Sequence, residues 1–75
     1  MPRRYTAREM QIIAEHLGWR YDHTRGSHAI SVREGYSHVT IPLHRRELDR
    51  GTTGDIIRQM GLRRRDFERI AQELL

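Results

Sequence analysis

The first regular pattern along the chain is an apolar stripe with the spacing of a helix. Its members recur at offsets of three, four and seven residues: Met10, Ile13, Ala14 and Leu17. Thr6 and Glu9 are placed to form a capping box, in which each side chain bonds to the backbone of the other residue. Gly18 is suited to end the helix in a left-handed conformation. The pattern therefore predicts a helix over about residues 7–17.

From residue 19 the apolar spacing changes to two, which is typical of strands with one face in water. Turns containing glycine and serine divide this part into three runs, over about residues 19–24, 28–33 and 38–43. Alternate residues share a face: Trp19, Tyr21 and His23; then His28, Ile30 and Val32; then Val39, Ile41 and Leu43, which are expected to point inward. The short connections predict an antiparallel meander. Pro42 lacks a backbone N–H and therefore places the third strand at an edge of the sheet or ends it there.

Two helical segments follow a polar loop that is expected over residues 44–50. Thr52 or Thr53 is suited to cap a short helix that ends at Gly61. The apolar residues of the two segments are Ile56, Ile57 and Met60, then Phe67, Ile70, Ala71 and Leu74. The last segment starts without a good cap, since arginines occupy positions 63–65. Each helix has one apolar stripe to bury, so the pattern predicts an α+β fold, a three-stranded antiparallel sheet with helices packed on one face.

The length of the chain limits what it can contain. Its 75 residues are expected to form one domain over residues 1–75, with a thin core and room only for a shallow site. Cysteine is absent, which excludes disulfides, thiolate zinc sites and a cysteine nucleophile. No apolar run reaches the length of a membrane span, and no hydrophobic signal region follows Met1. A cytoplasmic protein without a membrane partner is therefore expected.

The basic residues indicate a preference among partners. Fourteen basic against ten acidic side chains give a net charge of +4, and every basic side chain apart from histidine is arginine. A guanidinium group binds a phosphate through two parallel hydrogen bonds, whereas lysine is a more strongly hydrated point charge. The composition thus favours a polyanionic partner, with the codon usage of a G- and C-rich genome as the alternative explanation.

Histidine is the residue type suited to proton transfer here, because imidazole ordinarily changes protonation near neutral pH. The sequence has five histidines, and no two of them have the i, i+4 helical spacing of a zinc enzyme. No carboxylate cluster indicates a magnesium site. We therefore expect no metal and no other cofactor.

Two basic clusters stand out: Arg25, Gly26, Ser27 and His28 between the first two strands, and His44, Arg45 and Arg46 after the third strand. Glycine lets backbone approach a ligand closely, and the N–H groups of a turn can bind phosphate oxygens. Metal-free RNA cleavage needs a base for the 2′-hydroxyl proton, a cation beside the phosphate and an acid for the leaving oxygen. A meander brings the second cluster beside the first. The plainer interpretations are a hairpin turn, with His28 at the edge of the core, and a solvated loop.

Five short segments form an ordered set along the chain: Gly18-Trp19, Arg25-Gly26-Ser27-His28, Ile41-Pro42-Leu43-His44, Gly51-Thr52, and Ile56 through Gly61-Leu62. In this order and spacing they resemble the HicA family of toxin mRNA interferases. The likeness covers about residues 8–70 and depends on the whole set, since no single piece is specific. The chain departs from the family pattern at Arg25, where lysine is usual, and at Ala29, where a second histidine is frequent.

The resemblance implies a fold like that of double-stranded-RNA-binding domains, helix-strand-strand-strand-helix, in agreement with the predicted order of elements. It implies a toxin of a type II toxin–antitoxin pair, a ribosome-independent and metal-independent endoribonuclease that cleaves mRNA and inhibits translation and growth. The family's catalytic histidine falls on His28, and His44 matches the histidine after the proline. The expected partner is a HicB-type antitoxin that covers the site, with DNA contacted only through the toxin–antitoxin complex.

Two other interpretations follow from the residues themselves. One is a non-catalytic RNA-binding module on the same scaffold, which grips the A-form backbone by its shape and its 2′-hydroxyl groups. The other is a helix-turn-helix, in which residues 55–60, the turn at Gly61 and the arginines at 63–65 contact DNA. A three-strand insertion of this size ahead of the motif argues against the second.

Overall fold

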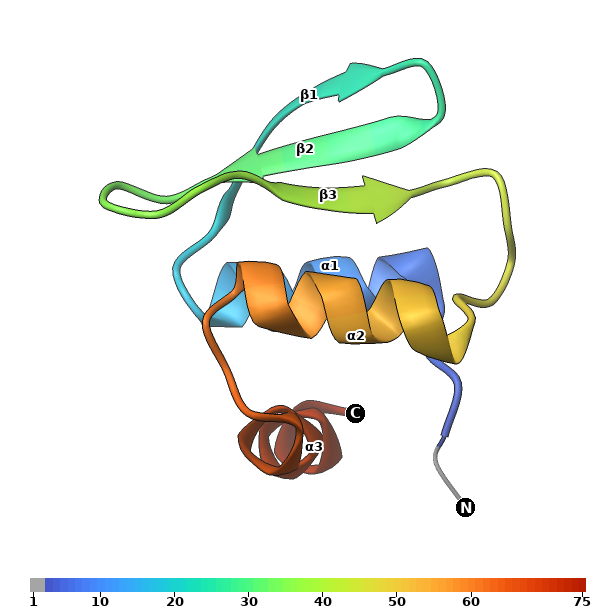
Figure 1. Cartoon of the computed structure of the whole chain (residues 1–75), viewed down its shortest axis with the longest axis vertical. Coiled ribbons are helices and arrows are strands. Elements are labelled where there is room, and N and C mark those ends of the chain that lie inside the picture. Colours follow the sequence, from blue (N-terminus) through green and yellow to red (C-terminus); the bar gives the residue numbers. More distant parts are fainter. Residues whose placement is uncertain (1–2) are drawn as a thin grey trace.

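The computed structural model describes residues 3–75 and has an α+β fold (Figure 1). Its elements are α1 (Ala7–His16), β1 (Arg20–Arg25), β2 (His28–Val32), β3 (Val39–Pro42), α2 (Arg50–Gln59) and α3 (Arg64–Leu74). The first five have the α-β-β-β-α order of a double-stranded-RNA-binding domain, as predicted, and α3 is an additional helix. Met1 and Pro2, the first residues of the expected domain, lie outside the described residues. Across residues 3–75, no helix is long and apolar enough to cross a membrane.

The elements are arranged in three layers, with the sheet as one outer layer (Figure 1). Helices α1 and α2 both pack against β3 on one face of the sheet, and α3 packs against both helices on the side away from the sheet. The prediction that the helices lie on one side of the sheet is confirmed, with α3 one layer further away. No helix of the described chain covers the other face, which we call the open face.

Strand pairing identifies the residues that face the helices. The sheet order is β1-β2-β3 and both pairs are antiparallel, as predicted. Directly opposite residues share a face, and the pairs Ala29–Ile41 and Ser31–Val39 are buried. Ser31 Oγ also accepts a hydrogen bond of 3.2 Å from Nε2 of Gln11 in α1. The helix-facing side of β2 therefore carries small residues.

His28 consequently lies on the open face together with Ile30 and Val32. The plainer interpretation, in which His28 sits at the edge of the core, is wrong, because the small neighbours Ala29 and Ser31 face the helices instead. Ile30 is nearly buried, at 9% exposure, without belonging to the helix-side core. Ile30 shares a face with His28, and its apolar side chain is the reason why the sequence pattern favoured that face, and not the face of Ala29 and Ser31, as the one turned toward the helices.

Strand β1 departs from the predicted alternation at an irregularity in its pairing. Tyr21 is opposite Ser31, whereas His23 is opposite Ile30, with a register shift between Tyr21 and His23. A bulge of this kind adds a residue to one strand and reverses the parity that follows. Tyr21 and His23, expected on one face, therefore lie on opposite faces, and His23 joins the open face.

Strand β3 lies at a sheet edge and ends at Pro42, both as predicted. Leu43, which was expected to point inward, follows the strand and is 47% exposed. The backbone N–H of Thr40 donates to Oε1 of Gln59 at 2.9 Å, so the end of α2 occupies an edge donor. This contact leaves the Thr40 N–H unavailable for pairing with a strand of another chain.

Helices α1 and α3 begin as the sequence predicts. The backbone N–H of Glu9 donates to Oγ1 of Thr6, and the N–H of Thr6 donates to Oε1 of Glu9, both at 3.0 Å. Gly18, with φ of +95°, follows the end of α1. Arg63 precedes α3 and provides no side-chain cap.

Helix α2 begins earlier than predicted, because its N-cap is Asp49 and not Thr52 or Thr53. The backbone N–H of Thr52 donates to Oδ1 of Asp49 at 2.7 Å. This bond holds the pKa of the Asp49 carboxyl below its ordinary value. Thr53 is instead buried inside the helix packing. The loop after β3 covers residues 43–49, one position earlier than the expected 44–50.

Candidate functional site

The β1–β2 hairpin positions the first basic cluster. Arg25 and His28 are opposite each other across the strands, and Gly26 and Ser27 form the turn between them. Gly26 has φ of +59°, whereas Ser27 has no positive φ, which is the pattern of a type II′ turn with glycine at its first central position. Arg25 and His28 are both exposed and, being opposite residues, are neighbours on the open face.

The loop after β3 is held by the backbone at both ends. The N–H of Leu43 donates to the carbonyl oxygen of Ser27 at 2.6 Å, and the N–H of Leu48 donates to that of Tyr5 at 2.8 Å. The Leu48 side chain is buried, at 1% exposure. Residues 44–46, between these anchors, are exposed. The loop therefore presents the second basic cluster next to the hairpin turn.

The structure brings His28 and His44 together. Pro42 is opposite His28 across β2 and β3, and His44 follows two residues later. The ring centroids of the two histidines are 6.3 Å apart and the rings meet at 65°. Arg45 and Arg46 continue the same exposed loop and are placed beside the pair by chain connectivity alone. The prediction that a meander unites the two clusters is confirmed for the histidine pair.

One further histidine lies on this face and was not predicted as part of the site. His23 is opposite Ile30, which makes it a diagonal neighbour of His28 on the open face. Its Nδ1 lies 2.7 Å from Oδ2 of Asp22, and both side chains are exposed. The irregularity between Tyr21 and His23 puts it there, and the sequence has no glycine or proline at that point to signal a bulge.

These groups can carry out acid–base chemistry on a phosphate. Imidazole can both accept and donate a proton near neutral pH, and the Arg25 guanidinium beside His28 can hold a phosphate oxygen. The turn at Gly26 leaves room for backbone to approach a ligand, since nothing lies within 4 Å of the position that a side chain would take there. Among residues 3–75, no group of three or more His, Asp or Glu side chains is arranged to hold a metal ion.

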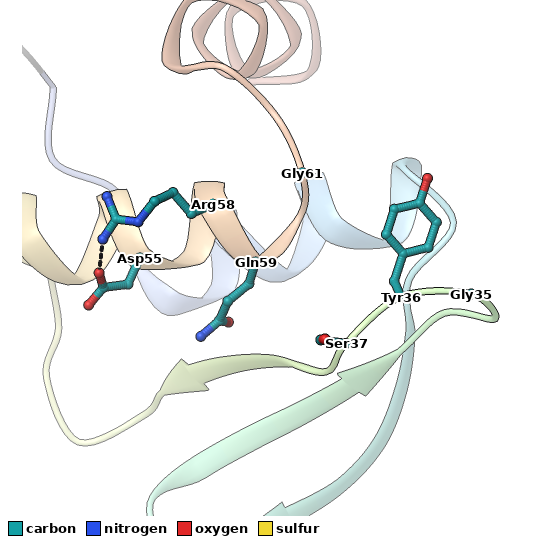
Figure 2. A pocket seen from close by; sticks show the side chains of 7 residues that line it. All are labelled: Gly35, Tyr36, Ser37, Asp55, Arg58, Gln59 and Gly61. Carbon is teal, nitrogen blue, oxygen red and sulfur yellow. Dashed lines mark hydrogen bonds and ion pairs between the residues drawn. The ribbon is translucent and has the colours of Figure 1, made fainter.

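A shallow hollow of about 650 Å³ lies at the opposite end of the sheet (Figure 2). It is lined by the β2–β3 turn, including Tyr36, and by the end of α2. Arg58 and Asp55 form an ion pair within it, and Gln59 is engaged with the β3 backbone. The charged side chains of this hollow are thus paired with each other, and Gln59 is engaged by β3. It contains no histidine, and we do not assign the chemistry to it.

The positive φ of Gly26 makes a specific prediction about the hairpin. Gly26→Ala is expected to lower the free energy of unfolding by about 1 to 2 kcal/mol, because an L-residue is strained at positive φ. No clash contributes, since the added Cβ meets nothing within 4 Å. Gly54→Ala is the matched control: Gly54 lies inside α2, where the same change is expected to stabilise by about 0.5 to 1 kcal/mol. Urea unfolding of the two variants measures this difference, and equal stabilities would contradict it.

The α-β-β-β-α fold, with Arg25 and a histidine pair at one end of its open face, places the chain among small proteins with the architecture of a double-stranded-RNA-binding domain. Residues 7–62 match the family model described as the HicA toxin of bacterial toxin–antitoxin systems. The chain therefore belongs to the HicA toxin family. The match ends before α3, which lies outside it. No curated protein sequence matches the chain significantly.

Proposed function

We propose that this protein is a toxin endoribonuclease that cleaves mRNA without a ribosome or a metal ion and thereby inhibits translation and growth. Toxins of the HicA family are generally ribonucleases. The observation that carries the proposal for this chain is the position of His28: exposed on the open face, opposite Arg25 and 6.3 Å from the ring of His44. The proposed setting is the cytoplasm, where mRNA is available.

In this proposal His28 is the catalytic residue and transfers a proton during cleavage. The 2′-hydroxyl of the RNA attacks the adjacent phosphorus, and the 5′ oxygen of the next nucleotide leaves. Arg25 and the turn formed by Gly26 and Ser27 hold the phosphate, because guanidinium and backbone N–H groups stabilise the negative charge that develops on its oxygens. The second basic cluster, comprising His44, Arg45 and Arg46, binds the RNA beside the scissile bond. Salt is expected to weaken this binding, since phosphate contacts release counterions.

The proposed partner is a HicB-type antitoxin that covers the open-face site. Membership of a toxin–antitoxin family supports an antitoxin partner in general. Beside the basic clusters, Tyr21 and Leu43 are each 47% exposed and border a groove of about 420 Å³ between α1 and the sheet. Exposed apolar side chains next to a charged rim are typical of a protein–protein contact. The groove lies on the helix side of the sheet and the histidine pair on the open face, so an antitoxin that used both would have to pass around the hairpin end of the sheet.

The proposal is tested with the purified protein and an unstructured RNA in the presence of a chelator. We expect fragments with 5′-hydroxyl and 2′,3′-cyclic phosphate ends, because attack by the 2′-hydroxyl produces these ends without a metal. Electrophoresis and end-labelling detect them. RNA that is bound but never cut, at any ionic strength, would contradict the proposal and favour a non-catalytic RNA-binding module. Binding to duplex DNA but not to RNA would instead favour the helix-turn-helix interpretation.

A further inference from the structure

We propose that His44 is the second proton-transfer group of this site and works with His28 on the same phosphodiester. The inference rests on the proposed ribonuclease function and goes beyond RNA binding by the second cluster. It assigns one imidazole to the 2′-hydroxyl and the other to the leaving oxygen. The assignment depends on three observations: the separation of the rings, the backbone contact that fixes it, and the chemistry of the neighbouring side chains.

The two rings are close enough for both to reach one bound phosphodiester. Their centroids are 6.3 Å apart, and no hydrogen bond joins one ring to the other. A general acid or base acts on an atom within about 2.6 to 3.2 Å of its nitrogen. Each ring can therefore reach a different oxygen of one phosphodiester, and both side chains are exposed on the side where RNA has access.

The backbone fixes the two rings relative to each other. The N–H of Leu43 donates to the carbonyl oxygen of Ser27 at 2.6 Å, so that the residues just before His44 and His28 are bonded directly. In addition, Pro42 is opposite His28 in the β2–β3 pair. The two histidines thus belong to one bonded unit, although sixteen positions separate them in the sequence. Fixed geometry of this kind is what acid–base catalysis requires, because a displacement of about 1 Å costs roughly 100-fold in rate.

The chemistry of the neighbouring groups leaves few alternatives to His44. Arginine stays protonated in proteins, so Arg25, Arg45 and Arg46 can bind a phosphate but cannot exchange a proton with it. His23 is a diagonal neighbour of His28, and one of its ring nitrogens is engaged by Asp22. His44 is the histidine whose ring lies against that of His28.

Two imidazoles account for both proton transfers of the cleavage step. A neutral ring takes the proton of the 2′-hydroxyl while the 2′ oxygen forms its bond to phosphorus. The bond from phosphorus to the 5′ oxygen breaks, and the protonated ring gives its proton to that oxygen. The products are a 2′,3′-cyclic phosphate and a 5′-hydroxyl, and the two histidines have exchanged protonation states. No oxidant, metal or other reactant is needed.

The test compares His44→Ala with wild-type protein and with His38→Ala as a matched control. His38 is an exposed histidine just before β3, at the end of that strand away from His44. We expect His44→Ala to lower the single-turnover cleavage rate by about 10²- to 10⁴-fold. Binding of an RNA whose scissile nucleotide lacks the 2′-hydroxyl should weaken by far less than the cleavage rate, because Arg25, Arg45 and Arg46 still hold the phosphates. The pH–rate profile of the variant should lose one of its two limbs, whereas His38→Ala should retain both.

A substrate with sulfur in place of the leaving 5′ oxygen adds a second readout, because a thiolate leaves without receiving a proton. We expect this substrate to restore the cleavage rate of one of the two variants, His28→Ala or His44→Ala, and not of the other. Restoration of both variants or of neither would overturn the inference. An unchanged pH–rate profile of His44→Ala would also overturn it, as would a His44→Ala defect in RNA binding alone. The same holds if His23→Ala, instead of His44→Ala, loses one limb of the pH–rate profile. If His28→Ala is inactive while His44→Ala cuts normally, the ribonuclease proposal stands and the inference fails. If the wild-type protein cuts no RNA, both fail.

Discussion

Replacing His28 by alanine is expected to lower the rate of RNA cleavage by about 10²- to 10⁴-fold, the usual contribution of a general acid or base. The same change should abolish growth arrest when the protein is produced without an antitoxin. The fold should persist, because His28 is exposed on the open face and contributes nothing to the helix-side core. Single-turnover cleavage of a labelled RNA and circular dichroism of the purified variant measure the two effects.

Two controls separate catalysis from binding and folding in this experiment. His28→Gln keeps a polar side chain at the position but cannot exchange a proton near neutral pH, so it should be as inactive as His28→Ala. His38→Ala should cleave at the wild-type rate. If His28→Ala binds an uncleavable RNA with nearly the affinity of the wild type, its loss of activity lies in the chemical step. Full activity of His28→Ala would remove the catalytic assignment.

The largest expected effect on stability comes from Phe67→Ala. Phe67 is fully buried between α3 and the rest of the core, and its ring meets that of Tyr5 edge to face, with centroids 5.1 Å apart. Truncating a buried phenylalanine to alanine costs about 3 to 5 kcal/mol. A chain of this length has a total stability of roughly 4 to 11 kcal/mol. The variant is therefore expected to be only marginally folded at 25 °C.

Urea unfolding followed by circular dichroism checks this expectation. Leu75→Ala is the matched control, since Leu75 is 43% exposed and an exposed substitution is expected to stay within about 0.5 kcal/mol of the wild type. Phe67→Leu retains much of the buried volume and should fall between the two. A Phe67→Ala midpoint equal to that of the wild type would show that α3 is not part of the cooperative core.

Local patterns in the sequence predicted the start or end of an element correctly where a single signal determined it. The capping box at Thr6 and Glu9 and the apolar stripe that follows it predicted α1 correctly. The missing N–H of Pro42 correctly predicted where β3 ends. The grouping of the two basic clusters also followed from local signals. Short connections predict a meander, and in a meander the C-terminal ends of β1 and β3 lie at the same end of the sheet, on either side of the start of β2.

The errors arose where tertiary packing decided between equivalent local choices. In β2 both parities were possible, and the small residues Ala29 and Ser31 face the helices because α1 approaches the sheet closely there, with Gln11 bonded to Ser31. At the start of α2 the sequence pattern favoured Thr52 or Thr53 as the cap, whereas Asp49 occupies the position. The bulge in β1 carries no sequence signal, so the position of His23 became apparent only from the pairing of the strands.

The three-layer arrangement has a practical consequence for handling the protein. Helix α3 is separated from the sheet by α1 and α2, and the chain reaches Leu75 on that far side (Figure 1). A fluorophore or affinity tag joined after Leu75 therefore projects away from the open face. Protein immobilised through such a tag presents the histidine pair to the solution, which suits surface-based measurements of RNA and antitoxin binding to the same molecule.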